Sequence, residues 1–180
     1  MRPDSLVAVA PLASVEEAAW CARLMATNEP WMTLGRTFDE GMRILQNPAK
    51  EVFVARTGQE QAGFLILDMN GPFPGYIQTV CVAPDARGRG IGSELIAWAE
   101  RRIFRESPNV FMCVSSFNVD AGRLYARLGY EVLGTLRSYI IAEHDEILLR
   151  KTQGPWREFS RSDEVGLVSE NPASSTQHTR

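Results

Sequence analysis

The sequence predicts a mixed α/β (α+β) domain in which helices lie on both faces of one central sheet. Short apolar runs bounded by turn residues, which are typical of strands, alternate with longer stretches of helical periodicity. The expected order is β-α-α-β-β-β-α-β-α-β-β, which corresponds to about seven strands. We therefore expect a mixed sheet.

Length and charge limit the classes of function. The chain has 180 residues, which suits one domain with a sizeable core. Its formal net charge of −3 creates no overall positive field, so we expect neither nucleic acid nor a membrane as a partner. No run of 18 apolar residues occurs, and the first residues lack the layout of a signal peptide. We expect a cytoplasmic protein.

The cysteines and histidines do not suggest a metal site. The three cysteines, Cys21, Cys81 and Cys113, are widely spaced and form no CxxC pair. We expect them to be buried free thiols in a reducing compartment. Only two histidines occur, His144 and His178. We expect no bound metal.

The first third of the chain predicts one strand and two helices. Residues 6–12 form a short apolar run that indicates a strand. Ser14, with Glu17 three residues later, has the capping-box pattern and begins a helix that ends near Thr27. A second, shorter helix is expected over 38–46.

Three strands are expected next. They cover 51–56, 62–69 and 76–82, and they are separated by a hairpin-like turn at 57–60 and a dense turn cluster at 70–75.

The rest of the chain returns to alternating helices and strands. The expected elements are a helix over 91–105, a strand over 110–114, a helix from Asn118 to a C-cap at Gly129, and strands over 130–136 and 146–151, with 137–145 part strand and part loop. We expect a domain over 1–153. The polar segment 154–180 has no periodicity and is expected to be disordered.

A loop rich in glycine and arginine stands between the strand at 76–82 and the following helix. Glycines allow a ligand to approach the backbone, and a helix N-terminus favours negative charge. Arg87 and Arg89 add donors that suit phosphate oxygens. The loop fits neither a Walker A sequence nor a dinucleotide fingerprint. Its pattern is Arg-x-x-Gly-x-Gly, and the alternative interpretation is a surface turn.

This pattern resembles the pyrophosphate loop of the GNAT family of acyl-CoA-dependent N-acetyltransferases, with Arg87, Gly90 and Gly92 at the matching positions. A second stretch, 118–130, resembles the family's motif of Asn, Ala, Leu-Tyr and Leu-Gly-aromatic. The element order over roughly 5–152 is also similar to the GNAT fold. The ribosomal-protein alanine acetyltransferases are a similar branch by pattern.

The resemblance implies a cofactor site. The strands at 76–82 and 110–114, the fourth and fifth of the sheet, would splay into a V that takes the pantetheine arm of acetyl-CoA, and the loop would hold the pyrophosphate. The residues implied in cofactor binding are Val80, Cys81, Val82, Arg87, Gly88, Arg89, Gly90, Ile91, Gly92, Ser93, Asn118, Ala121 and Tyr125.

The resemblance also implies a mechanism. An amine would attack the thioester carbonyl directly, while the N–H of Val82 or a neighbour polarises that carbonyl. Tyr125 would be the general acid that protonates the leaving thiolate. The alternative interpretation of Tyr125 is a half-buried core aromatic.

The sequence leaves the identity of the general base open. The alanine acetyltransferase branch has a glutamate five residues before the asparagine of the second motif, and this chain has Cys113 there. A buried thiol is a poor replacement, because burial raises its pKa. The other candidates are Glu29, Asp68, Glu143, His144, Asp145 and, through an ordered water, Gln78.

We expect an acetyl-CoA-dependent N-acetyltransferase that acts on a small amine or on a peptide N-terminus or lysine, as a monomer or homodimer. Contacts to the acceptor are expected from Glu29, Trp31, Gln78 and Tyr139. The alternative is a non-catalytic acyl-CoA-binding or sensing domain on the same fold, in which the missing glutamate would need no replacement.

Overall fold

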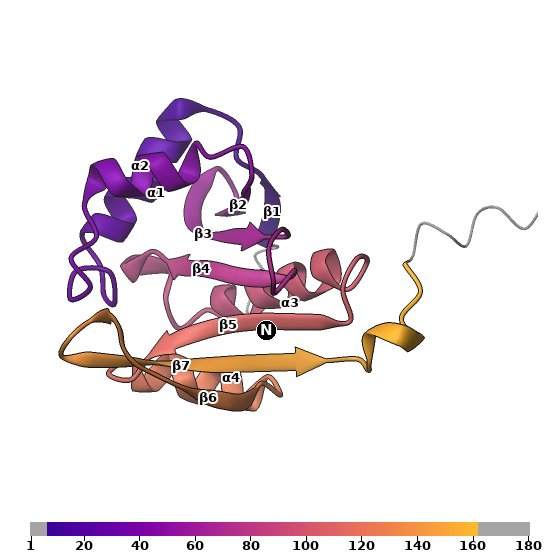
Figure 1. The fold of residues 1–180 in the computed structure, drawn as a ribbon. Coiled ribbons are helices and arrows are strands. Elements are labelled where there is room, and N and C mark those ends of the chain that lie inside the picture. Colours follow the sequence, from indigo (N-terminus) through magenta and orange to yellow (C-terminus); the bar gives the residue numbers. More distant parts are fainter. Residues whose placement is uncertain (1–6, 162–180) are drawn as a thin grey trace, which may run out of the picture.

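The computed structural model describes residues 7–161 and confirms the predicted order of elements (Figure 1). Seven strands form one mixed sheet in the order β1-β2-β3-β4-β5-β7-β6. The strands are β1 (Val7–Pro11), β2 (Glu51–Thr57), β3 (Glu60–Asp68), β4 (Tyr76–Val82), β5 (Asn109–Ser115), β6 (Glu131–Ile141) and β7 (His144–Thr152). The helices are α1 (Val15–Ala26), α2 (Phe38–Leu45), α3 (Ile91–Ile103) and α4 (Val119–Arg127), with 3-10 turns η1 (Pro84–Ala86) and η2 (Trp156–Glu158).

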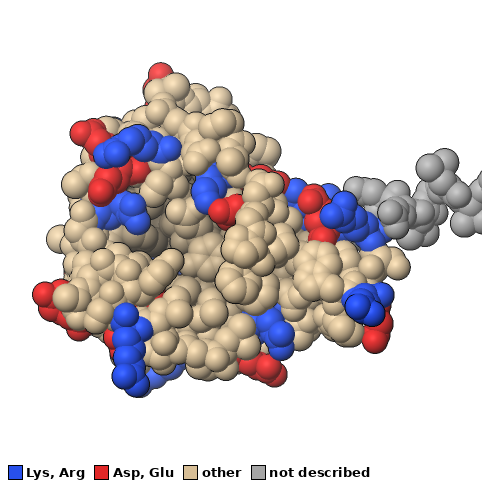
Figure 2. All heavy atoms as spheres, in the orientation of Figure 1, with Lys and Arg blue, Asp and Glu red and all other residues tan. Residues whose placement is uncertain are grey.

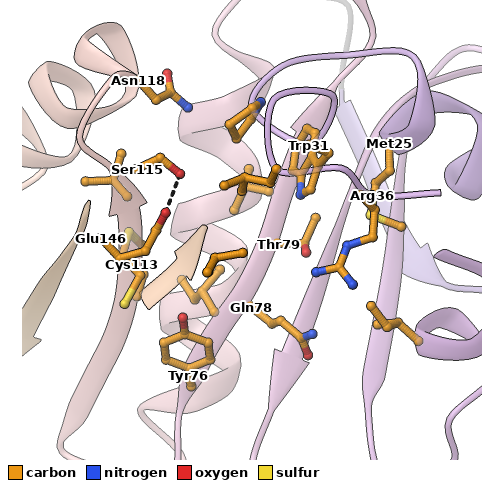
Figure 3. A pocket seen from close by; sticks show the side chains of 18 of the residues that line it. Met25, Trp31, Arg36, Tyr76, Gln78, Thr79, Cys113, Ser115, Asn118 and Glu146 are labelled. Carbon is orange, nitrogen blue, oxygen red and sulfur yellow. Dashed lines mark hydrogen bonds between the residues drawn. The ribbon is translucent and has the colours of Figure 1, made fainter. Parts of the chain in front are cut away.

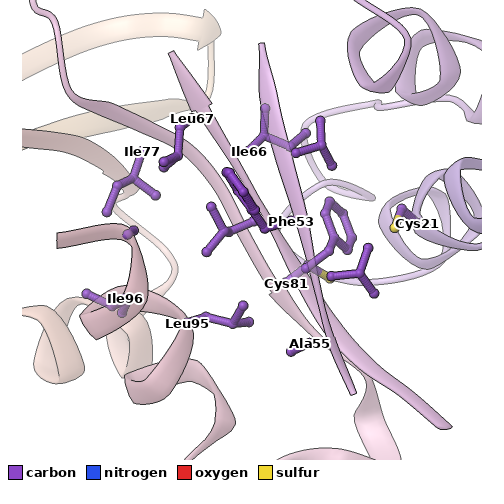
Figure 4. Packing of buried hydrophobic residues seen from close by; sticks show 14 of the residues in the cluster. Cys21, Phe53, Ala55, Ile66, Leu67, Ile77, Cys81, Leu95 and Ile96 are labelled. Carbon is purple, nitrogen blue, oxygen red and sulfur yellow. The ribbon is translucent and has the colours of Figure 1, made fainter. Parts of the chain in front are cut away.

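The core lies on both sides of the central strands, as expected for a sheet with helices on each face. Cys21 of α1 packs on one side of the strands, whereas Leu95 and Ile96 of α3 pack on the other (Figure 4). β3 has a continuous buried run from Ala62 to Leu67, because helices cover both of its faces. No helix within residues 7–161 is long and apolar enough to cross a bilayer.

The start of α1 differs from the expected capping box. The Ser14 side chain accepts a hydrogen bond from Glu17 N–H at 3.2 Å, as predicted. The Glu17 carboxylate, however, accepts from Ala13 N–H at 2.8 Å and pairs with Arg56 of β2. It therefore ties α1 to the sheet. A reciprocal capping box occurs instead in α2, between Thr37 and Glu40.

The last hairpin is more regular than the sequence suggests. β6 continues to Ile141, so most of 137–145 is strand and only the tip is a turn. A hydrogen bond of 3.0 Å from Ser138 N–H to Oδ1 of Asp145 holds the two arms together past a register shift. In the predicted tail, Trp156 packs edge-on against Phe159 at 6.0 Å between ring centroids. The remainder, 162–180, lies outside the described residues, and the domain boundary stays a prediction.

β4 and β5 diverge as the resemblance implies. They form the one parallel pair of the described sheet, and their register contains just two pairs, Tyr76 with Phe111 and Ile77 with Met112. The β3–β4 register shifts at the same level, and Gln78 has no Cα partner on β3. A bulge of this kind bends a strand and increases its twist. The two strands therefore separate beyond Ile77 and Met112.

Candidate active site

The loop between β4 and α3 leaves backbone donors free. Gly88 and Gly90 have φ values of +73° and +84°, in the left-handed region that favours glycine. Gly90 is the N-cap of α3, so no side chain satisfies the first N–H groups of that helix. Ile91 is buried in the core and contributes only its backbone here, as does Gly92. The turn from Gly88 to Ser93 can therefore bind an anion through its backbone.

Arg87 has a structural contact that the sequence does not reveal. Its Nη2 donates to Oδ1 of Asn28 at 3.0 Å, and its Nε donates to the Val82 carbonyl at 3.3 Å. The guanidinium thus joins the end of α1 to the end of β4. The exposed Arg89 forms no ion pair with any of residues 7–161, and it remains available to an anion on the loop.

The free edge of β4 faces the gap to β5. Ala83 N–H donates to Ala62 of β3 at 2.9 Å. Because peptide groups of successive strand residues point to alternate sides, those of Val80 and Val82 point away from β3, toward the gap. The Cys81 side chain is buried in the core, and burial raises the pKa of its thiol to about 12. By the same alternation the Cys81 peptide group points toward β3, so neither the side chain nor the backbone of Cys81 faces the gap.

A cavity of about 370 Å³ opens where the two strands separate. The connection between α1 and α2 faces the tip of the β6–β7 hairpin at this end of the sheet, and the surface is hollowed there (Figures 1 and 2). The cavity brings together six of the predicted residues, which come from four parts of the chain: Trp31, Gln78, Val80, Asn118, Tyr125 and Tyr139. Figure 3 shows the side chains of the two walls directed into it.

Tyr125 and Asn118 reach the cavity from α4 and from the turn before it. Burial raises the pKa of Tyr125 to about 12, so its phenol stays protonated at neutral pH. The ring packs edge-on against Tyr130 at 6.2 Å between centroids. The Asn118 side chain makes no capping hydrogen bond to α4 and is free to contact a ligand. Ala121 packs against the core from the same helix and does not line the cavity.

Four of the candidate bases lie outside the cavity. Glu29 is exposed, and its carboxylate accepts hydrogen bonds from the backbone and hydroxyl of Thr33 at 3.1 and 3.0 Å. Glu143 is exposed at the hairpin tip, and His144 packs on Phe117 with ring centroids 4.5 Å apart. Asp145 is used to close the hairpin.

Asp68 lines the cavity but has a partner. Burial alone would raise the pKa of this carboxyl, but hydrogen bonds from Lys50 and from Asn70 N–H, together with the Lys50 charge, hold it below its usual range. Asp68 is therefore a paired carboxylate and a weak proton acceptor.

Glu146 is a cavity residue that the sequence analysis missed. It is 4% exposed, it lines the cavity from β7, and its Oε1 accepts a hydrogen bond of 2.5 Å from the Ser115 hydroxyl (Figure 3). Burial raises the pKa of the carboxyl, and the Ser115 bond opposes this in part. The available signal was an acidic residue directly before the apolar run 147–149.

Gln78 sits at the bulge of β4, and its Oε1 is buried with no hydrogen-bond partner among the described residues. A buried amide oxygen without a donor is costly, so a donor from a ligand or a water would be favoured there. The expected contact to an acceptor is therefore chemically reasonable. Within residues 7–161 no three His, Cys, Asp or Glu side chains are grouped as a metal site would require.

Known proteins resemble this chain along most of its length. Residues 12–130 match the model of the Acetyltransferase (GNAT) family. A mycothiol acetyltransferase of Mycobacterium leprae is 30% identical over 142 residues, covering 73% of this chain and 42% of that protein. The N-alpha-acetyltransferase RimI of Mycobacterium tuberculosis is 28% identical over 137 residues, covering 74% of this chain and 82% of that protein. The chain thus spans less than half the length of the mycothiol acetyltransferase.

A solved structure agrees with the fold. The spermidine N-acetyltransferase of Vibrio cholerae, in complex with CoA and spermine, has a TM-score of 0.66 at 19% identity, and the match covers 83% of this chain and 97% of that one. The family model extends from the end of β1 to Tyr130 and includes both predicted motifs. The chain belongs to the GNAT family of acetyltransferases.

Proposed function

We propose that the chain is an acetyl-CoA-dependent N-acetyltransferase that moves an acetyl group to a primary amine. The observation that carries this proposal is the convergence of Val80, Asn118 and Tyr125 on one cavity between diverging strands. The edge of β4, which can bind an extended pantetheine arm, thus lies close to the protonated phenol of Tyr125.

The residues present suit the parts of acetyl-CoA. The backbone of Gly88–Ser93 and the guanidinium of Arg89 would hold the pyrophosphate, because free N–H groups and a cation favour a dianion. The peptide groups of Val80 and Val82 would bind the pantetheine amides as an added strand would. α4 has no fully buried residue, so its inner side is open enough to form the opposite wall.

The chemistry needs one carbonyl polariser and one proton donor. The N–H of Val82 or of a neighbouring residue, where it is not used by the pantetheine arm, is a suitable donor to the thioester oxygen, on which negative charge develops during attack. The Tyr125 hydroxyl is a suitable donor to the thiolate, because its raised pKa keeps the proton on the phenol until the leaving group needs it.

The acceptor is a small primary amine or an amine of a peptide. Trp31, from the connection between α1 and α2, and Tyr139, from the β6–β7 hairpin, line the cavity, and Tyr139 is 66% exposed. Both positions suit contact with an entering acceptor. RimI is named an N-alpha-acetyltransferase and the Vibrio cholerae enzyme a spermidine N-acetyltransferase, so relatives of this fold differ in acceptor.

One observation favours acyl-CoA binding without catalysis as a second candidate. Cys113 stands where the similar branch has a glutamate, and burial raises the pKa of its thiol. A neutral thiol cannot accept the proton of an amine. If no other group serves, the chain would bind acetyl-CoA and transfer nothing.

The test is release of CoA thiol from acetyl-CoA in the presence of small amines, polyamines, amino acids and short peptides. Tyr125→Phe keeps the ring and removes the hydroxyl, so kcat should fall by about 100-fold while the acetyl-CoA Kd changes by less than about twofold. If Tyr125→Phe releases thiol at the wild-type rate, Tyr125 is not the general acid. Acetyl-CoA binding with no thiol release for any acceptor would favour the second candidate.

A further inference from the structure

The cavity contains one buried carboxylate without a cationic partner. Glu146 forms no ion pair within residues 7–161, whereas Asp68 in the same cavity is paired with Lys50. Burying a carboxylate costs free energy unless cations or several donors compensate it. Ser115 supplies one hydrogen bond. A glutamine could accept that same bond without a charge, so the fold itself does not require a carboxylate at this position.

Glu146 lies close to Cys113, which stands where the similar branch has a glutamate on β5. Glu146 is the direct cross-strand partner of Ser115, and Cys113 lies two residues earlier on β5, so its side chain points to the same face as that of Ser115. Burial is the main cause of the raised pKa of both Cys113 and Tyr76, and the Glu146 charge adds to each. Figure 3 shows these four side chains on one wall of the cavity. β7 therefore places a carboxylate beside Cys113, the β5 position that has no carboxylate.

We propose that Glu146 is the catalytic residue that accepts the proton of the acceptor amine. The inference rests on the proposed acetyl transfer. An alkyl amine enters as an ammonium ion, and its transfer of one proton to the Glu146 carboxylate leaves a neutral amine and a carboxylic acid. The nitrogen lone pair then forms the C–N bond to the thioester carbon.

The remaining proton transfers balance the reaction. The C–S bond breaks with its electron pair on sulfur, and the thiolate takes a proton from the Tyr125 hydroxyl. The new amide nitrogen gives its surplus proton to the Tyr125 phenolate, which restores the phenol. Glu146 releases its proton to solvent through the cavity. The net products are an N-acetyl amine, free CoA thiol and one proton.

Other titratable and charged groups line the cavity around Glu146. The pKa values of Cys113 and Tyr76 are raised, so both stay neutral through the acid range. Tyr139, Arg36 and the Lys50–Asp68 pair also line the cavity. Burial would raise the pKa of Asp68, but hydrogen bonds from Lys50 and from Asn70 N–H outweigh this effect, so the pKa lies below its usual range. An acid limb in the pH dependence of kcat is therefore expected to report Glu146.

The experiment compares Glu146→Gln, Glu146→Asp and the matched control Glu143→Gln, whose residue is exposed and outside the cavity. Glu146→Gln should lower kcat by about 100-fold or more, remove the acid limb, and change the acetyl-CoA Kd by less than about twofold. Glu146→Asp should restore part of kcat with an acid limb. Wild-type kcat in Glu146→Gln, or an unchanged acid limb, would overturn the proposal.

A second measurement decides without turnover. The carboxyl carbon of Glu146 can be followed by NMR in protein labelled with carbon-13 glutamate, and Glu146→Gln assigns the signal. A carboxyl that ionises below about pH 8 supports a proton acceptor, whereas one that stays protonated at about pH 9 excludes it. Failure of acetyl transfer itself looks different, because wild-type protein would then bind acetyl-CoA and release no thiol.

Discussion

The Ser115 hydroxyl donates a hydrogen bond of 2.5 Å to Oε1 of Glu146 and thereby joins β5 to β7 inside the cavity. The two residues are direct cross-strand partners. Burial raises the pKa of Glu146, and the bond from Ser115 works in the opposite direction. Ser115 therefore helps to set the pH at which the carboxylate forms.

Ser115→Ala should shift the acid limb of kcat to higher pH. Without the donor, the carboxylate loses stabilisation and the pKa of Glu146 rises further. Well above that pKa, kcat should stay within about threefold of wild type, because the proton acceptor is still present. Ser116→Ala is the control, since Ser116 is exposed and accepts only the Asp145 N–H at 3.3 Å. The pH dependence of thiol release is measured for both variants. An acid limb at the wild-type pH in Ser115→Ala would contradict the role of Ser115 in lowering the pKa of Glu146.

Glu146→Gln should make the fold more stable at neutral pH. The pKa of Glu146 is raised in the folded state, so the folded protein prefers the protonated form and loses stability as pH rises through that pKa. Glutamine has no such loss and can still accept the Ser115 hydrogen bond. The Tm difference between variant and wild type should be near zero at about pH 4 and should grow toward pH 8.

Thermal unfolding at a series of pH values checks this, with Glu143→Gln as the exposed control. The result connects stability with function, because an unpaired buried charge that is needed for catalysis lowers the free energy of unfolding. A Tm difference that does not depend on pH would mean that burial does not perturb this carboxyl.

The hydrogen bond between Arg87 and Asn28 predicts that a substitution after α1 changes both the stability of the fold and the binding of acetyl-CoA at the glycine loop. Asn28→Ala removes the acceptor of a 3.0 Å bond from a charged donor and should cost about 1–2 kcal/mol in the free energy of unfolding. It also releases the Arg87 end of the loop, so the acetyl-CoA Kd should rise severalfold. Asn28→Asp is the matched control because it keeps an acceptor for Arg87. Denaturant unfolding and titration calorimetry measure the two effects, and equal Kd values for both variants would separate this contact from the cofactor site.

The sequence was sufficient to predict the elements and the family. Periodicity and turn residues placed most helices and strands within a few positions, because most of them bury a regular apolar face. The exception is the largely exposed β6, which continues beyond its expected end at 136 to Ile141. The glycine loop and the 118–130 stretch are local patterns, and both lie inside the matched family model. The match therefore shows the family.

The unpredicted features are contacts between distant segments. Arg87 meets Asn28 across 59 residues, and Glu146 meets Ser115 across 31. Periodicity within one element contains no information on such pairs, and strand register fixes them only once the sheet has formed. The bulge at Gln78 is likewise set by pairing with β3. The candidate bases predicted from the sequence included His144 and Asp145 on β7 but not the next residue, Glu146, whose contact with Ser115 depends on the pairing of β5 with β7.

Gly90→Glu should weaken acetyl-CoA binding through charge rather than through strain. A matched control exists in the β2–β3 turn: Gly58 and Gly90 have φ values of +63° and +84°, and a Cβ at either would meet no atom within 4 Å. Either glutamate should therefore cost about 1 kcal/mol of stability from the left-handed backbone. Only the one on the loop would stand beside the pyrophosphate, so the Kd should rise at least about tenfold, or ~1.4 kcal/mol, in Gly90→Glu alone. Calorimetry of both variants at low salt measures the two Kd values. Equal Kd values for acetyl-CoA would mean that the pyrophosphate does not bind at this loop.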